Sequence, residues 1–357
     1  MAALAKHAVI FQTLHQAINR GTYRTGDRLP SETALGRRFK ASRPTVAQAL
    51  RNLSQLGLVD RHAGAGTFVR HRAPALAGTL GLLADGLHAT EIAEPVSVEL
   101  SRAASAAGWQ VLMGDALAGR DPGAIADEWA ARGVKGVFLA PLEHHPVRAA
   151  VNHALAERLG QRGLAVVLLD RDLGDFPERS RHDLVAMDDF FAGLDLAAHI
   201  LGRSRRRLAF VARPEFPATT DLRLAGVRAA VARVDEARVE FCVGLSNDPV
   251  WVKKMLTRTR ADAVICSNDS TAAELIQTLH HLRLAIPGDV MVAGFDDVRY
   301  ARLLSPALTT MRQPCAALGT TAVETMLSRL RLPHAPARRI LLRAEVIARA
   351  STGHPPR

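Results

Sequence analysis

Hydrogen-bond donors are concentrated at the start of a predicted helix near residue 42. Arg43, Thr45 and Gln48 would share its outward face, so that a guanidinium, a hydroxyl and an amide project together. Ser42 is a good residue to cap this helix, and Pro44 is tolerated in the first turn, where backbone N–H groups have no helical partner. Guanidinium, hydroxyl and amide groups bond phosphate oxygens and base edges. The pattern therefore indicates a helix end suited to contact with nucleic acid.

Apolar residues in the same segment show which helix face is buried. Val46, Leu50 and Leu53 fall at positions i, i+4 and i+7, so they form one stripe opposite the donors. This spacing predicts that the stripe packs into a core and that the donor-bearing face stays in solvent.

A shorter helix is predicted just before this one. Ser31 follows a proline and is a good N-cap, and Leu35 and Phe39 form an apolar stripe. Two helices joined by a tight turn, the second with a polar and basic first turn, are suited to place that turn in a DNA major groove.

A hairpin is predicted after the two helices. Residues 58–69 alternate around Gly64 and Gly66, which would form the tip. Because glycine has no side chain, the backbone of such a wing can approach phosphates closely.

The charge distribution supports the same interpretation. Residues 1–75 hold 12 Lys and Arg against 3 Asp and Glu, a net charge of +9, while the rest of the chain holds 34 against 32, or +2. A basic charge concentrated in one fifth of the chain is typical of a phosphate-binding module.

From about residue 9 to residue 70, these motifs resemble the GntR-type winged helix-turn-helix. The resemblance implies that Arg43 contacts a base, that Ser42 and Thr45 contact phosphates, and that Gly64 lies in the wing tip. Members of that family often carry arginines where this chain has Ala47 and Thr33, so the operator sequence does not transfer simply. The candidate DNA-contacting residues are Ser31, Ser42, Arg43, Pro44, Thr45, Gln48, Gly64 and Gly66.

A different pattern follows a short basic linker. Short apolar runs, such as residues 79–84, 165–169 and 263–266, alternate with longer amphipathic segments. This alternation is typical of parallel sheets covered by helices on both faces, and the runs are too many for one comfortable sheet. We expect a DNA-binding domain at 1–70, a linker at 71–78 and an α/β domain of two similar subdomains at 79–353.

Polar residues directly follow several of these apolar runs. Asp85, Asp170, Asn268 and Asp296 would lie at the carboxyl ends of parallel strands, where ligands bind in such sheets. Carboxylates and an amide that converge on a cleft suit a polyhydroxylated ligand. The alternative for any one of them is that it merely caps the next helix.

Several phrases between about residues 80 and 352 resemble the LacI/GalR effector domain, which has the periplasmic-binding-protein fold. They include CSND at 266–269, IPGDV at 286–290, GFDD at 294–297 and LSPALTT at 304–310. A GntR-type reader joined to such a domain is similar to the hybrid regulators that include arabinose repressors. The resemblance implies a transcriptional regulator, a repressor of carbohydrate-related genes, whose operator affinity is controlled by a small effector.

The resemblance also implies effector contacts. Family members often carry a ligand-clamping arginine where this chain has Asp221, and an Asp-Asn phrase where it has Asp189 and Phe190. A cleft lined by carboxylates without that arginine would be strongly acidic, which predicts a neutral sugar, a polyol or an amino sugar. The candidate effector-binding residues are Asp85, Glu91, Ile92, Asp170, Asp221, Asn268 and Asp296.

Other function classes find little support in the sequence. No run of 18 apolar residues exists and no signal-peptide core is recognisable, so we expect a cytoplasmic protein that does not enter a membrane. The three cysteines include no CxxC pair, and the adjacent histidine pairs are poor metal sites. We expect no catalytic residues, metal or cofactor, and therefore no enzyme. A transport-type carbohydrate-binding protein remains the alternative, although it would have no use for residues 1–70.

A homodimer on a palindromic operator is expected, because one such reader makes too small a contact for genomic specificity. Binding of the effector would close the cleft, and this closure would change the distance between the two DNA-binding domains of the dimer. Both an induced repressor and a corepressor-dependent repressor fit this scheme.

Overall fold

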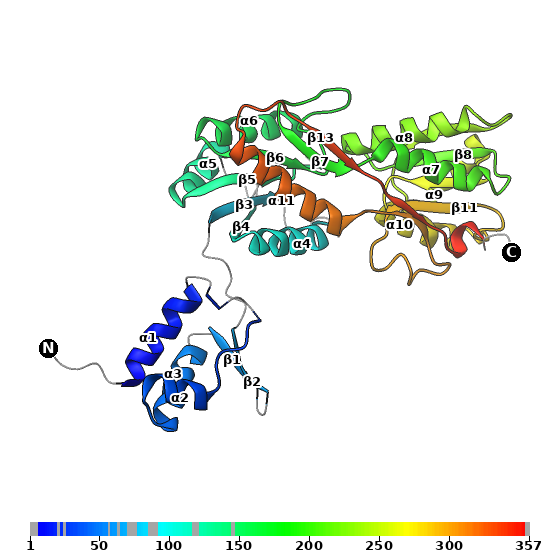
Figure 1. Cartoon of the computed structure of the whole chain (residues 1–357). Coiled ribbons are helices and arrows are strands. Elements are labelled where there is room, and N and C mark those ends of the chain that lie inside the picture. The colour runs from blue at the N-terminus through cyan, green and yellow to red at the C-terminus, as the bar shows by residue number, and fades with distance from the viewer. Residues whose placement is uncertain are drawn as a thin grey trace. The chain divides into compact units, whose positions relative to one another are not determined.

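A computed structural model of the chain describes residues 6–19, 22–23, 26–55, 58–62, 65–69, 77–84, 92–115, 121–143 and 147–353 (Figure 1). The chain divides into two compact units, Met1–Ala75 and Leu76–Arg357. The division falls inside the segment expected to be a linker. Within the described residues, no helix is both long and apolar enough to span a bilayer.

In its described residues, the first unit contains three helices and a hairpin. Its elements are α1 (Lys6–Asn19), α2 (Glu32–Phe39), α3 (Arg43–Gln55), β1 (Val59–His62) and β2 (Gly66–Val69). The predicted stripe of Val46, Leu50 and Leu53 is buried against Ile10 and Leu14 of α1, which confirms the predicted buried face of α3.

Local geometry sets the turn between α2 and α3. Ser31 accepts a hydrogen bond from the backbone N–H of Ala34 at 3.2 Å and caps α2 as predicted. Lys40 ends that helix in the left-handed region, with φ of 45°, and α3 begins at Arg43.

The hairpin is antiparallel and is joined to the preceding segment. Val59 pairs with Val69, and Arg28 forms a bridge to Phe68. Gly66 has φ of +124°, and a β-carbon there would lie 2.6 Å from Nε of Arg28. Both the backbone angle and the close approach therefore favour glycine at this position.

The second unit contains two six-stranded sheets, as the alternating pattern predicted. The first sheet has the order β13-β7-β6-β5-β3-β4 and the second β14-β12-β11-β10-β8-β9; every pair is parallel except β12 with β14. The strands are β3 (Gly78–Ala84), β4 (Trp109–Asp115), β5 (Val134–Leu139), β6 (Ala165–Leu169), β7 (Asp183–Met187), β8 (Arg207–Ala212), β9 (Arg238–Val243), β10 (Ala263–Cys266), β11 (Met291–Asp296), β12 (Thr309–Arg312), β13 (Arg339–Leu342) and β14 (Glu345–Ile347).

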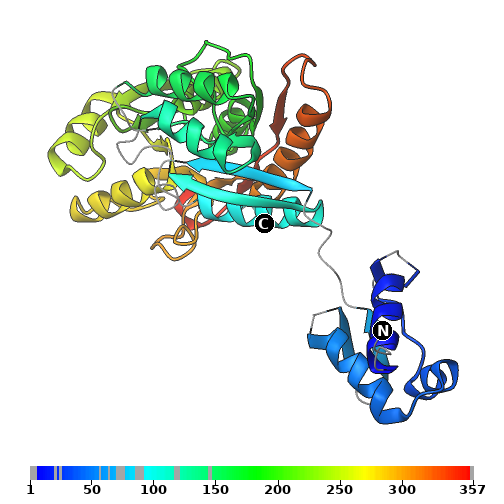
Figure 2. The ribbon, with the colours of Figure 1, turned by 90° about the vertical axis from the view of Figure 1, so that its left-hand side faces the viewer.

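Helices cover both faces of each sheet. They are α4 (Ala93–Ala106), α5 (Pro122–Ala131), α6 (Arg148–Gln161), α7 (Asp189–Leu201), α8 (Ala218–Val231), α9 (Pro249–Thr259), α10 (Asp269–His281) and α11 (Cys315–Arg331), with a short 3₁₀ helix at Ala350–Thr352. Although α11 comes late in the chain, it packs on α4 of the first subdomain (Figures 1 and 2). The chain therefore passes between the subdomains before α7, before α11 and before β14.

Packing on both faces explains why the strands are almost continuously apolar. In β8, Phe210 faces the cluster under α7 and α8, whereas its neighbour Val211 faces the cluster under α9 and α10. In β5, Phe138 and Val137 divide in the same way between the two faces of the first sheet.

Candidate functional site

A cavity of about 390 Å³ lies where strands of both sheets end. Asp170 follows β6, Arg213 follows β8, Asn268 follows β10 and Asp296 ends β11; all four line the cavity. The carboxyl-end rule therefore brings Asp170, Asn268 and Asp296 to one place. Ile92, at the start of α4, lines the same cavity.

The other candidate effector residues have different positions. Asp85 and Glu91 lie outside the described residues. Asp221 belongs to the first turn of α8 and is not among the residues lining the cavity. Burial and the nearby carboxylate of Asp175 raise the pKa of Asp221, while Arg148 acts in the opposite direction.

Among the described residues, the lining of the cavity contains as many cationic as anionic side chains. The cationic ones are Arg171, Arg213 and Arg223, and the anionic ones are Glu143, Asp170 and Asp296. The expectation of a strongly acidic lining is wrong at Asp221, which does not line the cavity, and Arg223, two positions later, supplies a buried guanidinium. The contribution of Asp85 and Glu91 stays a prediction, because both lie outside the described residues.

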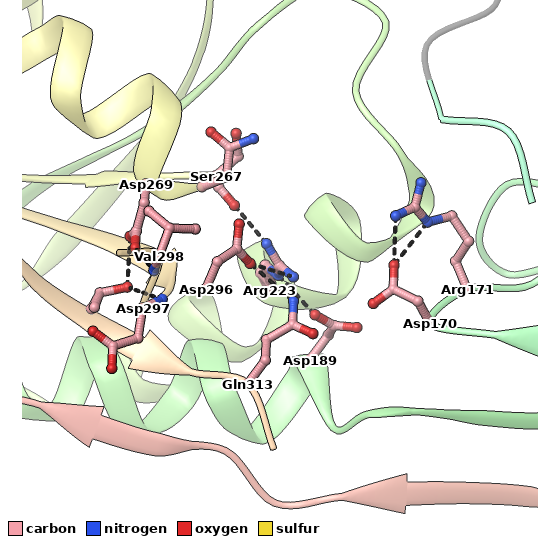
Figure 3. A network of polar contacts seen from close by, with 12 residues as sticks. Asp170, Arg171, Asp189, Arg223, Ser267, Asp269, Asp296, Asp297, Val298 and Gln313 are labelled. Atoms are coloured by element: carbon pink, nitrogen blue, oxygen red, sulfur yellow. Dashed lines mark hydrogen bonds and ion pairs between the residues drawn. The ribbon is translucent and has the colours of Figure 1, made fainter. Parts of the chain in front are cut away.

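Arg223 has the most highly connected side chain in this site (Figure 3). Its Nε donates to Oδ1 of Asp189 at 2.7 Å, and its Nη1 donates to the carbonyl oxygen of Ser267 at 2.7 Å. Its Nη2 lies 3.8 Å from Oδ1 of Asp296, and the guanidinium lies 4.7 Å from the ring centroid of Phe295. The side chain is 7% exposed, so these contacts hold a charge away from bulk water.

Two glycines allow the helix crossing that brings Arg223 to Asp189. A β-carbon at Gly226 would lie 1.9 Å from the carbonyl oxygen of Phe190, and one at Gly193 would lie 2.0 Å from that of Arg223. No larger residue fits either position without separating α7 from α8. Arg223 and Gly226 lie two and five positions after Asp221, so the sequence contained a signal for this site, but the prediction used only Asp221.

Arg171 forms a second buried ion-pair group. Its Nε and Nη2 donate to Oδ2 of Asp170 at 3.0 and 2.5 Å, and its Nη1 lies 2.9 Å from Oε2 of Glu143. Burial acts to raise the pKa of Asp170, but the charge and hydrogen bonds of Arg171, together with the charge of Arg223, more than offset it, so this pKa lies below its ordinary value. Asp170 is therefore a carboxylate at neutral pH.

Asp296 is different, because burial dominates there. Desolvation raises its pKa to about 7, although Arg223 and a 2.9 Å hydrogen bond from Nε2 of Gln313 oppose the change. Behind it, the buried carboxyl of Asp269 accepts from Oγ1 of Thr310 at 2.6 Å and from the backbone N–H of Val298 at 3.1 Å. Burial and the charge of Asp296 raise the pKa of Asp269 well above its ordinary value.

Asn268 shows that capping and cavity lining are compatible. Its Oδ1 accepts from the backbone N–H of Thr271 at 2.9 Å and caps α10, while the residue also lines the cavity. The alternative of simple capping was therefore correct in part for this residue.

Two cavity-lining residues that we had not selected carry unsatisfied polar atoms. Oε1 of Gln313 and Oγ1 of Thr271 are buried and have no hydrogen-bond partner among the described residues. Buried polar groups normally have partners, so a ligand with hydroxyl groups would satisfy them.

The DNA-facing candidates lie mainly at the start of α3. Arg43 is 85% exposed, and the hydroxyls of Ser42 and Thr45 lie 2.7 Å apart. Pro44 occupies the first turn of the helix and is exposed. Gln48 is exposed and donates to Oδ1 of Asn52 at 3.0 Å.

The remaining candidates serve the local fold or fall elsewhere. The hydroxyl of Ser31 is used as the cap of α2. Gly66 begins β2 of the hairpin, and Gly64 lies outside the described residues. Contact of any of these residues with DNA stays a prediction.

Comparison with protein families matches both units. Residues 6–69 match the bacterial regulatory proteins of the gntR family, and residues 197–352 match a periplasmic binding protein-like domain.

Named relatives are regulators. The arabinose metabolism transcriptional repressor of Geobacillus stearothermophilus is 25% identical over 98% of each chain. The ribose operon repressor of Escherichia coli (strain K12) is 29% identical over 56% of this chain and 62% of its own.

Solved structures share the fold. The transcriptional regulator CelR in complex with cellobiose has a TM-score of 0.65 at 21% identity, covering 87% of this chain and 92% of its own. A LacI family regulator from Enterococcus faecium with bound ribose has a TM-score of 0.62 at 22% identity, covering 77% and 98%. The chain therefore joins a gntR-family helix-turn-helix domain to a periplasmic-binding-protein-like domain with the LacI-type two-subdomain fold.

Proposed function

We propose that the protein is a transcriptional repressor of carbohydrate-related genes whose operator affinity is controlled by a small sugar-like effector. The observation that carries the proposal is the combination, in one chain, of a basic winged helix-turn-helix with a two-subdomain cleft fold. The full-length similarity to an arabinose repressor supports the same combination. A transport-type binding protein would share the second unit but would have no use for the first.

A neutral sugar or polyol suits the cavity better than an anion. Each cavity arginine already has a carboxylate partner: Arg171 has Asp170 and Glu143, Arg213 has Glu274, and Arg223 has Asp189. An anionic ligand would compete with these carboxylates, because among the described lining residues every cationic side chain already has a carboxylate partner. Ligand hydroxyls, in contrast, would satisfy the acceptor oxygens at Thr271 and Gln313. The balanced charge gives an amino sugar no particular advantage.

The regulator is proposed to act in the cytoplasm as a homodimer on a palindromic operator. Effector binding would change operator affinity through a coupling free energy of about 1–3 kcal/mol, or about 5–150-fold. An inducer lowers that affinity and a corepressor raises it.

Two measurements test the proposal. Selection from random duplex DNA should enrich one sequence with two inverted half-sites, and mobility shifts should give its affinity. Thermal melting against neutral sugars, polyols, amino sugars, sugar acids and sugar phosphates should identify the effector, since a ligand at 100 times its Kd adds about 2.7 kcal/mol. Adding the effector to the mobility shift then gives the sign of regulation. If no sequence is enriched either in the absence of the effector or in its presence, the protein is not a sequence-specific regulator.

A further inference from the structure

The carboxylate of Glu32 lies between an arginine at the start of α3 and an arginine in strand β1 of the hairpin. Glu32 begins α2, directly after the capping residue Ser31. Its Oε2 accepts from Nε of Arg43 at 3.1 Å, and its Oε1 accepts from Nη2 of Arg61 at 2.5 Å. The two oxygens thus hold one arginine from the start of α3 and one from strand β1 of the wing.

We propose that Glu32 is a positioning residue for base recognition. It fixes the guanidinium of Arg43 and joins α3, the helix that begins with Arg43, to strand β1 of the wing. The inference rests on the proposed function, because it concerns how the same chain reads its operator. It concerns a residue outside the set of predicted DNA contacts.

The geometry of the pair leaves the reading atoms of Arg43 available. The bond to Glu32 uses Nε, and the terminal nitrogens Nη1 and Nη2 have no partner in the part of the chain that the structure describes. Two parallel N–H groups are what a bidentate contact to O6 and N7 of guanine requires. A guanidinium is planar, so a carboxylate at Nε fixes the plane in which those two donors lie.

Restricting the conformation of Arg43 affects DNA binding because this side chain is 85% exposed and has few contacts to hold it. An exposed arginine loses much of its rotamer entropy when it is fixed in one conformation. A partner that restricts it before DNA arrives reduces the loss on binding. Arg61 is 37% exposed and Glu32 22%, so the carboxylate is partly shielded and Arg43 is the more exposed of its two partners.

Stability alone gives this carboxylate little reason to be there. Exposed ion pairs contribute little to stability, and a carboxylate in the first turn of a helix adds only a small favourable interaction with the helix dipole. A negative charge close to DNA is repelled by phosphates. A bidentate arginine contact, in contrast, discriminates strongly between bases, so a residue that positions Arg43 can have a larger effect on recognition than on stability.

The test uses the full chain and the operator selected with the wild-type protein. In mobility shifts, E32Q should lower the ratio of operator affinity to random-DNA affinity about 5-fold or more, with the loss concentrated at the base pair that R43A also relaxes. Affinity for random DNA should be unchanged or higher, because a repelling charge is removed. The matched control is E99Q, which breaks a similar exposed pair with Arg102 in the second unit. It should change neither the ratio of operator affinity to random-DNA affinity nor the affinity for random DNA.

A double-mutant cycle separates positioning from a structural role. If Glu32 acts through Arg43, E32Q in the R43A background should change the ratio of operator affinity to random-DNA affinity by less than about 2-fold. The melting temperature of the single variant E32Q should be close to that of the wild-type protein. Additive losses, or an unchanged ratio for E32Q, would overturn the inference while the regulator assignment stands. Failure of the wild-type protein to select any sequence would instead remove the proposed function itself.

Discussion

The buried guanidinium of Arg223 donates from Nε to Oδ1 of Asp189 at 2.7 Å, with 7% and 3% of the two side chains exposed. The pair joins α8 to the first turn of α7, directly after the chain crosses from the first subdomain to the second. Arg223 lines the cavity, and Asp189 follows the crossing from β7 to α7. The ion pair therefore connects the wall of the ligand cavity directly to a segment that joins the two subdomains.

Removing the cationic partner should be strongly destabilising. R223M leaves Asp189 buried without its cation, which costs about 3–5 kcal/mol in comparable buried pairs. Urea unfolding measures the loss. R102M, which breaks an exposed pair with Glu99, is the control and should change stability by about 1 kcal/mol or less. Equal effects of the two variants would contradict the structural role of the buried pair.

The close crossing of α7 and α8 gives a second prediction. G226A should destabilise the protein by about 1–3 kcal/mol, since its new methyl group would overlap the carbonyl oxygen of Phe190 and force the helices apart. G160A in α6 is the matched control, because nothing lies within 4 Å of a β-carbon there. Alanine should be neutral or stabilising by up to about 1 kcal/mol at that helical position. Thermal melting distinguishes the two, and a loss in G160A as large as in G226A would refute the steric argument.

Features that depend on a local pattern of residues, such as strands and their carboxyl ends, could be predicted from the sequence. The apolar run at 263–266 predicted β10, and the rule that ligands meet strand carboxyl ends brought Asp170, Asn268 and Asp296 into one cavity. Arg223 was missed because its burial depends on the Gly193 and Gly226 crossing, which no helical periodicity reveals.

Some strands were missed for a similar reason. The segment of β7 begins with the buried carboxylate of Asp183, which is unusual for a strand on sequence alone. Arg329, 146 positions later, satisfies it with bonds of 2.9 and 3.0 Å. β13 is short and alternates between exposed and half-buried residues at the sheet edge, so it also lacks the continuous apolar signal.

The raised pKa of Asp296 predicts a specific pH dependence of stability. Its pKa is about 7 in the folded protein, so between about pH 4 and pH 7 the folded state holds a proton that the unfolded state has released. Stability from this group is therefore complete below pH 4 and is lost as pH rises through 7. Asp189, whose pKa burial raises to about 6, acts in the same direction.

The variant D296N removes that titration. Urea unfolding between pH 4.5 and 8 should show a flatter decline than wild type, by up to about 1.4 kcal/mol per pH unit where a single proton is released. Parallel pH profiles for D296N and wild type would mean that Asp296 titrates alike in the folded and unfolded chain.

The unsatisfied hydroxyl of Thr271 offers a test of the ligand site that separates binding from stability. Thr271 and Thr278 are both buried threonines on α10, but they differ in their partners. Oγ1 of Thr278 donates to the carbonyl oxygen of Ser246 at 2.8 Å, whereas Thr271 is a cavity-lining residue whose buried Oγ1 has no partner among the described residues.

Valine has nearly the shape of threonine, so T271V should leave the free protein as stable as wild type or slightly more stable, because no hydrogen bond is lost. Its affinity for the effector found by melting should fall about 5-fold or more, as a ligand hydroxyl loses its acceptor. T278V should behave in the opposite way, losing about 1–3 kcal/mol of stability by leaving the Ser246 carbonyl unsatisfied while effector affinity is retained. Calorimetric titration and urea unfolding of the two variants measure both quantities. If T271V binds the effector as tightly as wild type, the ligand does not contact Thr271. The acceptor role then falls to Gln313, which lies between β12 and α11.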